Sequence, residues 1–263
     1  MGRAAAFFDL DKTIIAKSST LAFGRPFFDN GLLNRRTVLK STYAQLVFMV
    51  SGADAEQVER MRKHITAMCT GWDVAQVHDI VHETLHEIVD PLVYDEAAEL
   101  IEAHRSEGRD VVIVSTSGLE LVGPIGEMVG ADHVIATRMV ADEGKYTGEI
   151  DYYAYGPNKA AAIADLAVER GYDLADCYAY SDSITDLPML EVVGHPTVVN
   201  ADRGLRKIAL ARGWPVLMFT KPVTLRSRFG ASRVPAVTGA ALGIGAAVAG
   251  IAWYAAKRRD RTA

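Results

Sequence analysis

The most constraining feature of the sequence is an alternation of short apolar runs and amphipathic stretches that begins near residue 95. The clearest run, 110–115, holds four consecutive β-branched residues, Val111 to Val114, as is typical of a strand buried on both faces. Stretches with helical spacing, 95–107 and 119–129, precede and follow it. This alternation predicts βαβ units, and therefore a mostly parallel sheet with helices on both faces.

Other segments extend the same pattern. Strands are predicted at 4–10, 133–136, 177–181, 197–200 and 215–219, a hairpin at 139–153, and helices at 158–170, 187–193 and 202–212. Between about residues 20 and 87 the spacing is only helical, with helices predicted at 56–68 and 73–89. We therefore predict an α/β, doubly wound core formed by 1–16 and 92–220, with an all-helical cap, 17–91, inserted after the first strand.

Composition narrows the class of protein. The 263 residues are 49% hydrophobic and 23% charged, which is a globular balance, and the net charge of -5 argues against a general nucleic-acid-binding protein. The two cysteines, Cys69 and Cys177, lie far apart and outside any zinc-binding pattern, as expected for a reducing compartment. The first apolar run ends at Asp9, too early for a secretory signal, so we expect none.

The C-terminal segment has a different character. Residues 236–256 carry no charge and are long enough for a helix to cross a bilayer, with Trp253 and Tyr254 near one end. A basic linker, 221–235, precedes this segment and a basic tail, 257–263, follows it. We predict a transmembrane helix that anchors a cytoplasmic catalytic domain. A buried or disordered Ala/Gly tail is the alternative.

Two acidic residues, Asp9 and Asp11, directly follow the first predicted strand. Carboxylates at the end of a buried strand must be paired, hydrogen-bonded or bound to a metal. Residues i and i+2 of an extended strand point the same way, so the two carboxyl groups can act on one substrate. One can attack phosphorus and the other can protonate the leaving alcohol. A turn with two solvated Asp residues is the structural alternative.

Further polar residues follow other predicted strands or open a helix, and the carboxyl ends of parallel strands share one edge of a sheet. Ser115, Thr116 and Ser117 stand at the end of the strand predicted at 110–115, and the predicted role of Ser115 and Thr116 is to bind a phosphoryl group. Lys159 begins a helix and would add a positive charge there. Asp182 follows the strand at 177–181 as a natural ligand, with Asp9, for Mg²⁺. Asp186 could bind a metal water or hold Lys159.

Each of these residues also has an ordinary structural interpretation. Ser115 alone is more often a residue of a strand-end turn, and Lys159 alone is usually an exposed helix lysine. Asp182 and Asp186 could be N-caps of the helix that begins at Leu187. The seven histidines show no metal-binding spacing, and we assign them no role.

Taken together, the chain resembles the haloacid dehalogenase superfamily of phosphohydrolases. The four motifs of that family occur in its order, over roughly residues 4 to 219. They are Asp9-Leu10-Asp11-Lys12-Thr13, Ser115 at the end of an apolar strand, Lys159, and the acidic pair Asp182 and Asp186. The predicted helical block resembles the cap of its phosphoserine-phosphatase-like subgroup, subfamily IB, as found in actinobacterial hydrolases.

The resemblance implies a role for each matching position. Asp9 would be the nucleophile and a Mg²⁺ ligand, and Asp11 the general acid/base, which binds the metal through its backbone carbonyl. Asp182 would be the third protein ligand, and Ser115 and Lys159 would bind the phosphoryl group. Thr13 completes the first motif, and Asp186 would support the metal site.

One departure bears on the substrate. Phosphoserine phosphatases carry a Glu shortly after the first motif that recognises the substrate's amino group, but residues 14–20 contain no acid and place Lys17 there. The hypothesis is therefore a Mg²⁺-dependent phosphomonoesterase for a small phosphorylated metabolite or a lipid-related phosphate. The alternatives are a phosphoserine phosphatase, a phosphotransferase, and a catalytically quiet membrane-tethered binding or regulatory protein. The oligomeric state is left unassigned.

Overall fold

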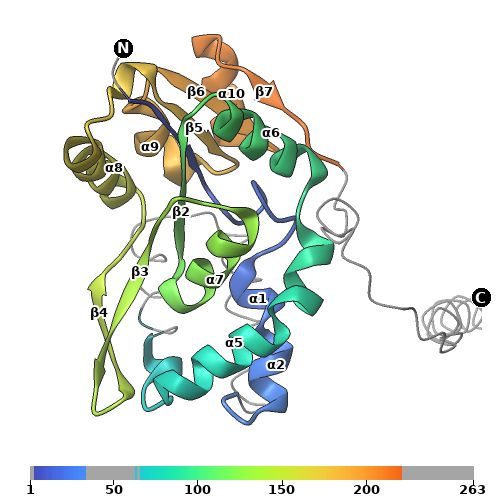
Figure 1. The fold of residues 1–263 in the computed structure, drawn as a ribbon, viewed down its shortest axis with the longest axis vertical. Coiled ribbons are helices and arrows are strands. Elements are labelled where there is room, and N and C mark those ends of the chain that lie inside the picture. The colour runs from blue at the N-terminus through green and yellow to red at the C-terminus, as the bar shows by residue number, and fades with distance from the viewer. Residues whose placement is uncertain (1–2, 34–62, 64–65, 221–263) are drawn as a thin grey trace, which may run out of the picture. The chain divides into compact units, whose positions relative to one another are not determined.

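A seven-stranded sheet forms the centre of the protein, with β1 (Ala5–Phe8) in its middle. The computed structural model describes residues 3–33, 63 and 66–220, which all belong to one unit, Met1–Arg228. The strand order is β4-β3-β2-β1-β5-β6-β7, and every neighbouring pair is parallel except β3 and β4 (Figure 1). The predicted α/β fold with a parallel sheet is thus confirmed.

The remaining elements alternate along the chain as predicted. The other strands are β2 (Asp110–Gly118), β3 (His133–Asp142), β4 (Lys145–Tyr152), β5 (Tyr178–Ser181), β6 (His195–Val199) and β7 (Val216–Leu217). The helices that lie wholly within the described residues are α1 (Ser19–Ala22), α2 (Gly24–Asp29), α5 (Val74–Val89), α6 (Asp95–Ser106), α7 (Leu119–Val129), α8 (Pro157–Arg170), α9 (Leu187–Glu191) and α10 (Arg203–Arg212), with short 3-10 turns at Asp90–Leu92, Leu174–Asp176 and Ile184–Asp186.

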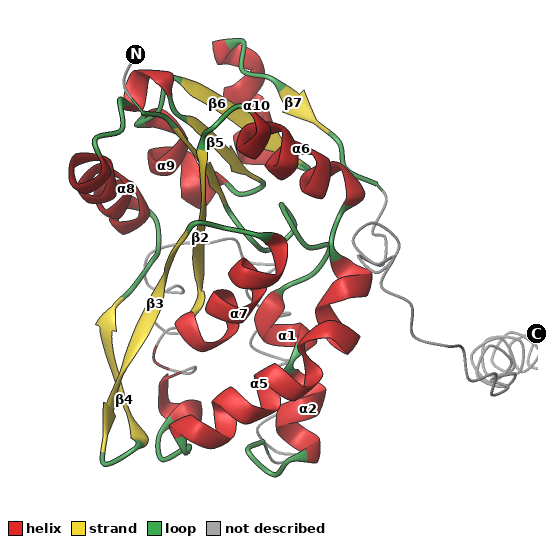
Figure 2. Ribbon diagram, in the orientation of Figure 1, coloured by secondary structure: helices red, strands yellow, loops and turns green. Residues whose placement is uncertain are grey.

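A hydrophobic cluster covers each face of the sheet. Figure 2 shows the helices that lie on either side of the sheet. Side chains of β1 alternate between the two: Ala6 and Phe8 join one cluster, and Ala5 and Phe7 the other. Helices α5, α6 and α7 pack in the first cluster, and α8, α9 and α10 in the second. Because β1 is buried on both faces, its carboxyl end is held rigidly.

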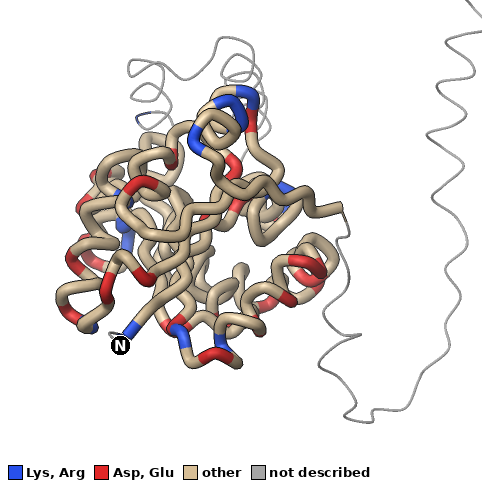
Figure 3. Tube along the Cα trace, turned by 90° about the horizontal axis from the view of Figure 1, so that it is seen from above, with Lys and Arg blue, Asp and Glu red and all other residues tan. Residues whose placement is uncertain are grey.

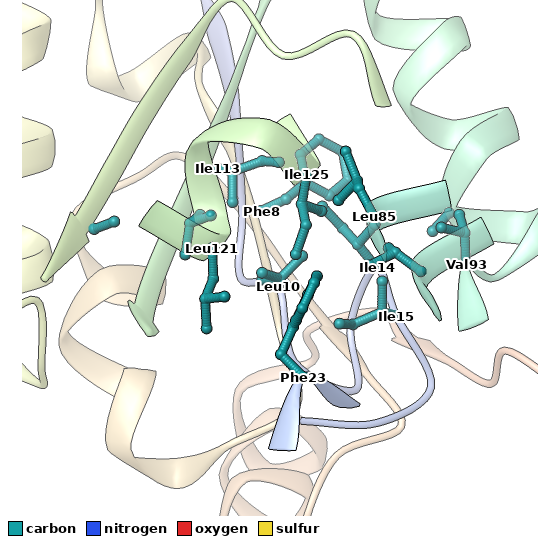
Figure 4. Packing of buried hydrophobic residues seen from close by; sticks show 14 of the residues in the cluster. Phe8, Leu10, Ile14, Ile15, Phe23, Leu85, Val93, Ile113, Leu121 and Ile125 are labelled. Carbon is teal, nitrogen blue, oxygen red and sulfur yellow. The ribbon is translucent and has the colours of Figure 1, made fainter. Parts of the chain in front are cut away.

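Two helices of the predicted cap, α2 and α5, share the first cluster with the sheet, and so does Phe23, which directly follows α1. Figure 4 shows Phe23 and Leu85 close to Leu10 and Ile14 of the segment that follows β1. Backbone hydrogen bonds also join this region to the β3–β4 hairpin: Gly71 N donates to Tyr146 O (2.7 Å), and Tyr146 N donates to Trp72 O (3.0 Å). The proposed domain boundaries remain predictions, because 34–62 and 64–65, with most of the helix predicted at 56–68, lie outside the described residues.

One element differs from its prediction. The strand expected at 133–136 and the first arm of the hairpin expected at 139–153 are a single strand, β3. Its first half pairs in parallel with β2, and its second half pairs antiparallel with β4. The break inferred between them does not exist because Thr137 continues the strand, and its hydroxyl donates to Thr116 O at 2.7 Å.

The predicted membrane segment is not covered by the structure. Within residues 3–33, 63 and 66–220, none of the helices combines the length and the apolar character needed to cross a bilayer. The linker 221–235, the span 236–256 and the tail 257–263 lie outside the described residues and remain predictions.

Candidate active site

Asp9 directly follows β1, which has β2 on one side and β5 on the other. The strand order therefore changes direction at the carboxyl end of β1. Such a switch point is where open α/β sheets bind ligands. Asp9 N donates to Tyr180 O (2.9 Å), which continues the β1–β5 ladder by one residue. Leu10 is fully buried in the hydrophobic cluster (Figure 4), which leaves the acidic residues on either side of it to face the strand ends.

The turn after Asp11 is tight and hydrogen-bonded through its backbone. Ile14 N donates to Leu10 O (2.9 Å), and Lys12 N donates to Ile15 O (2.7 Å). Lys12 has φ +63°, a left-handed conformation that costs a non-glycine residue about 1–2 kcal/mol. Its side chain is two-thirds exposed, and its Nζ lies 3.7 Å from Asp182 Oδ2. The turn thus brings a cation close to the strand end of β5.

Lys159 joins two of the predicted acidic residues. Its Nζ donates to Asp9 Oδ1 (2.7 Å) and to Asp186 Oδ2 (2.9 Å), and only 1% of its side chain is exposed. Ser181 Oγ donates to the same Asp186 oxygen (2.7 Å). Although Asp186 stands at the N-cap position of α9, its side chain makes no capping hydrogen bond there. The two simple alternatives, an exposed helix lysine and a capping Asp186, are therefore wrong.

Asp11 is held by hydroxyl and amide groups of α1 and β2. Ser19 N donates to Asp11 Oδ1 (2.8 Å), and Ser117 Oγ lies 3.5 Å from Asp11 Oδ2. Ser19 Oγ in turn donates to Ser117 Oγ (2.8 Å). Burial raises the pKa of Asp11, and the hydrogen bonds from Ser19 act against that rise. A carboxyl group with a raised pKa is suited to exchange a proton with a substrate near neutral pH.

At the polar end of β2, the hydroxyl groups of the two predicted phosphate-binding residues have different hydrogen-bond partners. Ser115 is buried, and its Oγ accepts a hydrogen bond from Ser117 N (3.2 Å). The Thr116 hydroxyl instead donates to Ala154 O (2.8 Å), in the segment between β4 and α8. A role of Thr116 in phosphate binding therefore stays a prediction that this hydroxyl contact does not support.

The loop after β5 is fixed by Asp202, a residue without an assigned role in the sequence prediction. Asp202 N donates to Asp182 O (2.8 Å), and Ile184 N donates to Asp202 Oδ2 (2.7 Å). Burial raises the pKa of Asp182 to about 6, although the nearby Lys12 ammonium acts in the opposite direction. Asp182 is therefore a buried carboxyl group on a braced loop, as a metal ligand would be.

The electrostatic balance of the site is negative. Burial raises the pKa of Asp9 well above its usual value; the Lys159 ammonium offsets only part of the rise, and the carboxylates of Asp186, Asp182 and Asp11 increase it. For Lys159 itself, burial would lower the pKa, but the charges of Asp9 and Asp186 outweigh it and the pKa is raised. The lysine thus stays charged, and the carboxyl groups exceed the cations available to them.

This surplus of carboxylate fits a hard divalent cation, which relieves repulsion between oxygens. No group of three His, Cys, Asp or Glu side chains with metal-binding spacing occurs in the described part of the chain. The predicted Mg²⁺ ligands need only two side chains, Asp9 and Asp182, because Asp11 would contribute its backbone carbonyl. The donor set is therefore compatible with Mg²⁺.

Two predicted residues stand apart from this cluster. Thr13 is 1% exposed, and its hydroxyl has no hydrogen-bond partner among the described residues. Lys17 is exposed just before α1, and no ion pair to it occurs in the described part of the chain. The sequence prediction missed the contacts of Ser19, Ser117 and Ser181. Ser117 was placed at the strand end without a role, although its position two residues beyond Ser115, on the same face of the strand, was a signal for one.

The sequence was also compared with protein families and with known proteins. Residues 6–191 match the family model of haloacid dehalogenase-like hydrolases. A probable phosphatase of Mycobacterium tuberculosis is 65% identical over 258 residues, which is 98% of this chain and 90% of the relative. A phosphoserine phosphatase of the same organism is 33% identical over 260 residues, which is 98% of this chain and 82% of the relative.

Solved structures share the fold. A protein of unknown function from Bordetella pertussis has a TM-score of 0.72 at 25% identity, and the match covers 82% of this chain and 99% of that one. A phosphoserine phosphatase solved as a phospho-aspartyl intermediate analogue has a TM-score of 0.61 at 19% identity, with 86% of this chain and 97% of that one covered.

Proposed function

Because the chain belongs to the haloacid dehalogenase-like hydrolase family, we propose that it is a Mg²⁺-dependent phosphomonoesterase that acts through an aspartyl-phosphate. The observation that carries this proposal is the buried Lys159 ammonium, which contacts Asp9 at 2.7 Å and Asp186 at 2.9 Å at the switch point of the sheet. A fixed cation beside a carboxylate nucleophile is what attack on an anionic phosphate ester requires.

In the proposed mechanism the two carboxyl groups after β1 have separate tasks. An Asp9 oxygen forms a bond to phosphorus while the bond from phosphorus to the ester oxygen breaks, and Asp11 gives its proton to the leaving alcohol. A water molecule then attacks the phosphorus, returns a proton to Asp11 and releases inorganic phosphate from Asp9. Bound Mg²⁺, held by Asp9, Asp182 and the Asp11 carbonyl, would supply charge neutralisation. Lys159 and Ser115 orient the phosphoryl oxygens.

The substrate that we favour is a small phosphorylated metabolite or a lipid-related phosphate. Exposed Lys17 stands where an acidic residue would recognise the amino group of phosphoserine. The second candidate is phosphoserine itself, which is favoured by the name of the 33% identical relative. Phosphate release from phosphoserine, glycerol phosphate and lysophosphatidate distinguishes the candidates: the first hypothesis expects the higher kcat/KM on the last two. Transfer to added alcohols would reveal a phosphotransferase.

The reaction itself is tested with p-nitrophenyl phosphate and the full-length protein. We expect phosphate release with Mg²⁺, loss of release after chelation, and recovery when Mg²⁺ is restored. Equal release before and after chelation would contradict metal dependence. No release from any ester under these conditions would favour the catalytically quiet binding protein.

We also propose that residues 236–256 anchor the protein in a membrane, with the catalytic residues on the cytoplasmic side. The support is the sequence alone: an uncharged segment of spanning length between two basic segments. Extraction of membranes with alkaline carbonate tests it. The protein should stay with the lipid, and release into the soluble fraction would reject the anchor.

Substitution Ser117→Ala tests the proposed support of the acid/base residue. The change removes the Ser117 hydroxyl near Asp11 Oδ2 but leaves the amide of Ser19 in place. Since a single hydrogen bond contributes about 1 kcal/mol, we expect kcat to fall about fivefold with little change in KM. Steady-state kinetics across pH measure this. The control is Ser106→Ala, which removes a hydroxyl that donates to Ala103 O, outside the site. If both variants keep the wild-type kcat, Ser117 does not position Asp11.

Substitution Lys12→Gly should strengthen metal binding and relieve the turn. Glycine adopts φ +63° without steric cost, and the loss of the ammonium 3.7 Å from Asp182 removes a competitor for the cation. An ion pair this exposed is worth at most about 1 kcal/mol, so the half-saturating Mg²⁺ concentration should fall no more than about fivefold. Lys12→Ala separates the effects, because it removes the charge but keeps the strained backbone. Weaker Mg²⁺ activation in both variants would show that Lys12 assists the metal site instead.

A further inference from the structure

Helix α10 presents a basic face to solvent. Arg203, Arg206 and Lys207 are exposed, and their spacing places them on one side of the helix. None of the three forms an ion pair within the described part of the chain, whereas Arg212 at the end of the helix pairs with Glu191. Figure 3 shows Lys and Arg positions gathered in the part of the tube that leads to the end of the described chain. The opposite side of α10 is buried through Leu205 and Ala209.

These cations do not serve the stability of the helix. Arg203 lies in the first turn, where the positive end of the helix dipole makes a cation unfavourable by about 0.3–1 kcal/mol, and Arg206 and Lys207 lie beyond that turn and gain nothing from the negative end. The first turn holds no acidic residue, and the N-cap Asp202 is already engaged by the amide groups of Leu205 and Ile184. A basic face without ion pairs in the described part of the chain, and without a stabilising role in the helix, therefore calls for a partner outside this helix.

An exposed leucine extends the same face. Leu210 stands one turn beyond Arg206 and Lys207, and 66% of its surface is exposed. A helix that combines a basic face with exposed apolar side chains matches the headgroup region of a bilayer, where cations meet lipid phosphates and an apolar side chain enters the boundary with the acyl chains.

The position of α10 in the chain favours the same partner. Only residues 213–219, which include the short strand β7, separate it from the end of the described chain at Thr220. The sequence that follows adds Lys221, Arg226, Arg228 and Arg233 before the uncharged segment 236–256. A nucleic acid is a less suitable partner, because the protein as a whole carries a net charge of -5.

We propose that the face formed by Arg203, Arg206, Lys207 and Leu210 binds the surface of an anionic lipid bilayer. This face begins directly after Asp202, which braces the Asp182 loop of the active site. Binding through α10 would therefore place that edge of the site next to the lipid headgroups. The proposal concerns a surface outside the catalytic cluster and does not depend on the reaction.

Vesicle flotation with the full-length protein tests it, using phosphatidylcholine vesicles with and without phosphatidylserine. Binding to the neutral vesicles is subtracted to remove the part that does not depend on lipid charge. The basic segments 221–235 and 257–263 are the same in every variant, so a difference between variants reports on the substituted residues. A basic residue near an anionic membrane contributes about 1 kcal/mol. The charge-dependent partition coefficient of the triple variant R203A/R206A/K207A should therefore be lower than that of the wild type by a factor of about ten or more. Thermal unfolding of each variant checks that it is folded.

The matched control is R25A/K145A/R170A, which removes the same number of exposed cations elsewhere on the described surface. We expect it to keep most of the charge-dependent binding. Equal losses in the two triple variants would overturn the proposal, since the effect would then be one of net charge. Binding of single-stranded RNA as tight as that of the anionic vesicles, and equally sensitive to R203A/R206A/K207A, would overturn it in favour of a nucleic-acid partner.

Discussion

Substitution Asp9→Asn should abolish turnover while leaving the protein folded. The amide keeps the shape of the side chain but cannot attack phosphorus, and loss of an enzyme nucleophile costs about four to six orders of magnitude in kcat. The check is phosphate release from p-nitrophenyl phosphate, together with acid quenching to trap labelled phosphate on the protein. Asp173→Asn, which changes only a capping residue of the Leu174–Asp176 turn, should match the wild type.

The stability of the same variant distinguishes loss of chemistry from loss of structure. The pKa of Asp9 is raised in the folded state, chiefly by burial. The ionised carboxylate is therefore destabilising at pH values above its folded pKa, and no such cost exists below the unfolded value of about 4. Asparagine removes this cost, so the free energy of unfolding near pH 8 should equal or exceed that of the wild type. Activity in Asp9→Asn equal to wild type would sink the assigned nucleophile, and an unfolded variant would show that Asp9 is mainly structural.

Substitution Lys159→Met should have the largest effect on stability. It removes the ammonium but keeps an unbranched side chain, and leaves Asp9 and Asp186 buried without a cation. Removal of one partner from a buried ion pair costs about 3–5 kcal/mol. The pKa of Asp9, which burial already raises, must rise further without the Lys159 ammonium, so the loss should be largest at neutral pH and should shrink toward pH 4 as Asp9 becomes protonated.

Chemical denaturation at several pH values measures this loss, and Lys207→Met, on the exposed surface of α10, is the control. The double variant D9N/K159M should recover part of the lost stability, because one of the two stranded charges is absent. A loss independent of pH would assign the effect to packing instead. Activity of Lys159→Met should also fall by about two orders of magnitude or more, as when a charge that stabilises the transferring group is removed.

The parts of this fold that the sequence predicts correctly depend on strong local signals. The β-branched run at Val111 to Val114 is buried on both faces in β2, and the helix predicted at 73–89 begins after Asp73, which caps α5 through Gln76 N. Lys159 opens α8 after the antiparallel strand β4, so only the family motifs placed it in the site. The convergence of Asp9 and Asp186 was also predictable, because parallel strands bring their carboxyl ends to one edge. Their distances were not, since these depend on the packing of residues far apart in the chain.

The failures have a common physical cause. β3 reads as two elements because its first half contacts a parallel neighbour and its second half an antiparallel one, so its pattern of burial changes midway. The contact of the Thr116 hydroxyl with Ala154 O was likewise not foreseen, and the predicted role of Thr116 in phosphate binding stays a prediction. The contacts around Asp11 involve Ser19 and Ser117, whose pairing is set by the meeting of α1 with β2. In each case the deciding neighbour is distant in sequence, and local periodicity carries no information about it.

The central place of β1 has a consequence for how the protein is made. Its partners come late in the chain: Ala5 aligns with Asp110 of β2, and Ala6 with Tyr178 of β5. During synthesis, the first strand must therefore leave the ribosome long before either neighbour exists, and contacts over such separations form slowly. Asp9, Lys159 and Asp186 can meet only after β5 has been translated. The nascent chain consequently holds no assembled site, and an emerging apolar strand such as β1 is the segment for which we expect a chaperone to matter most.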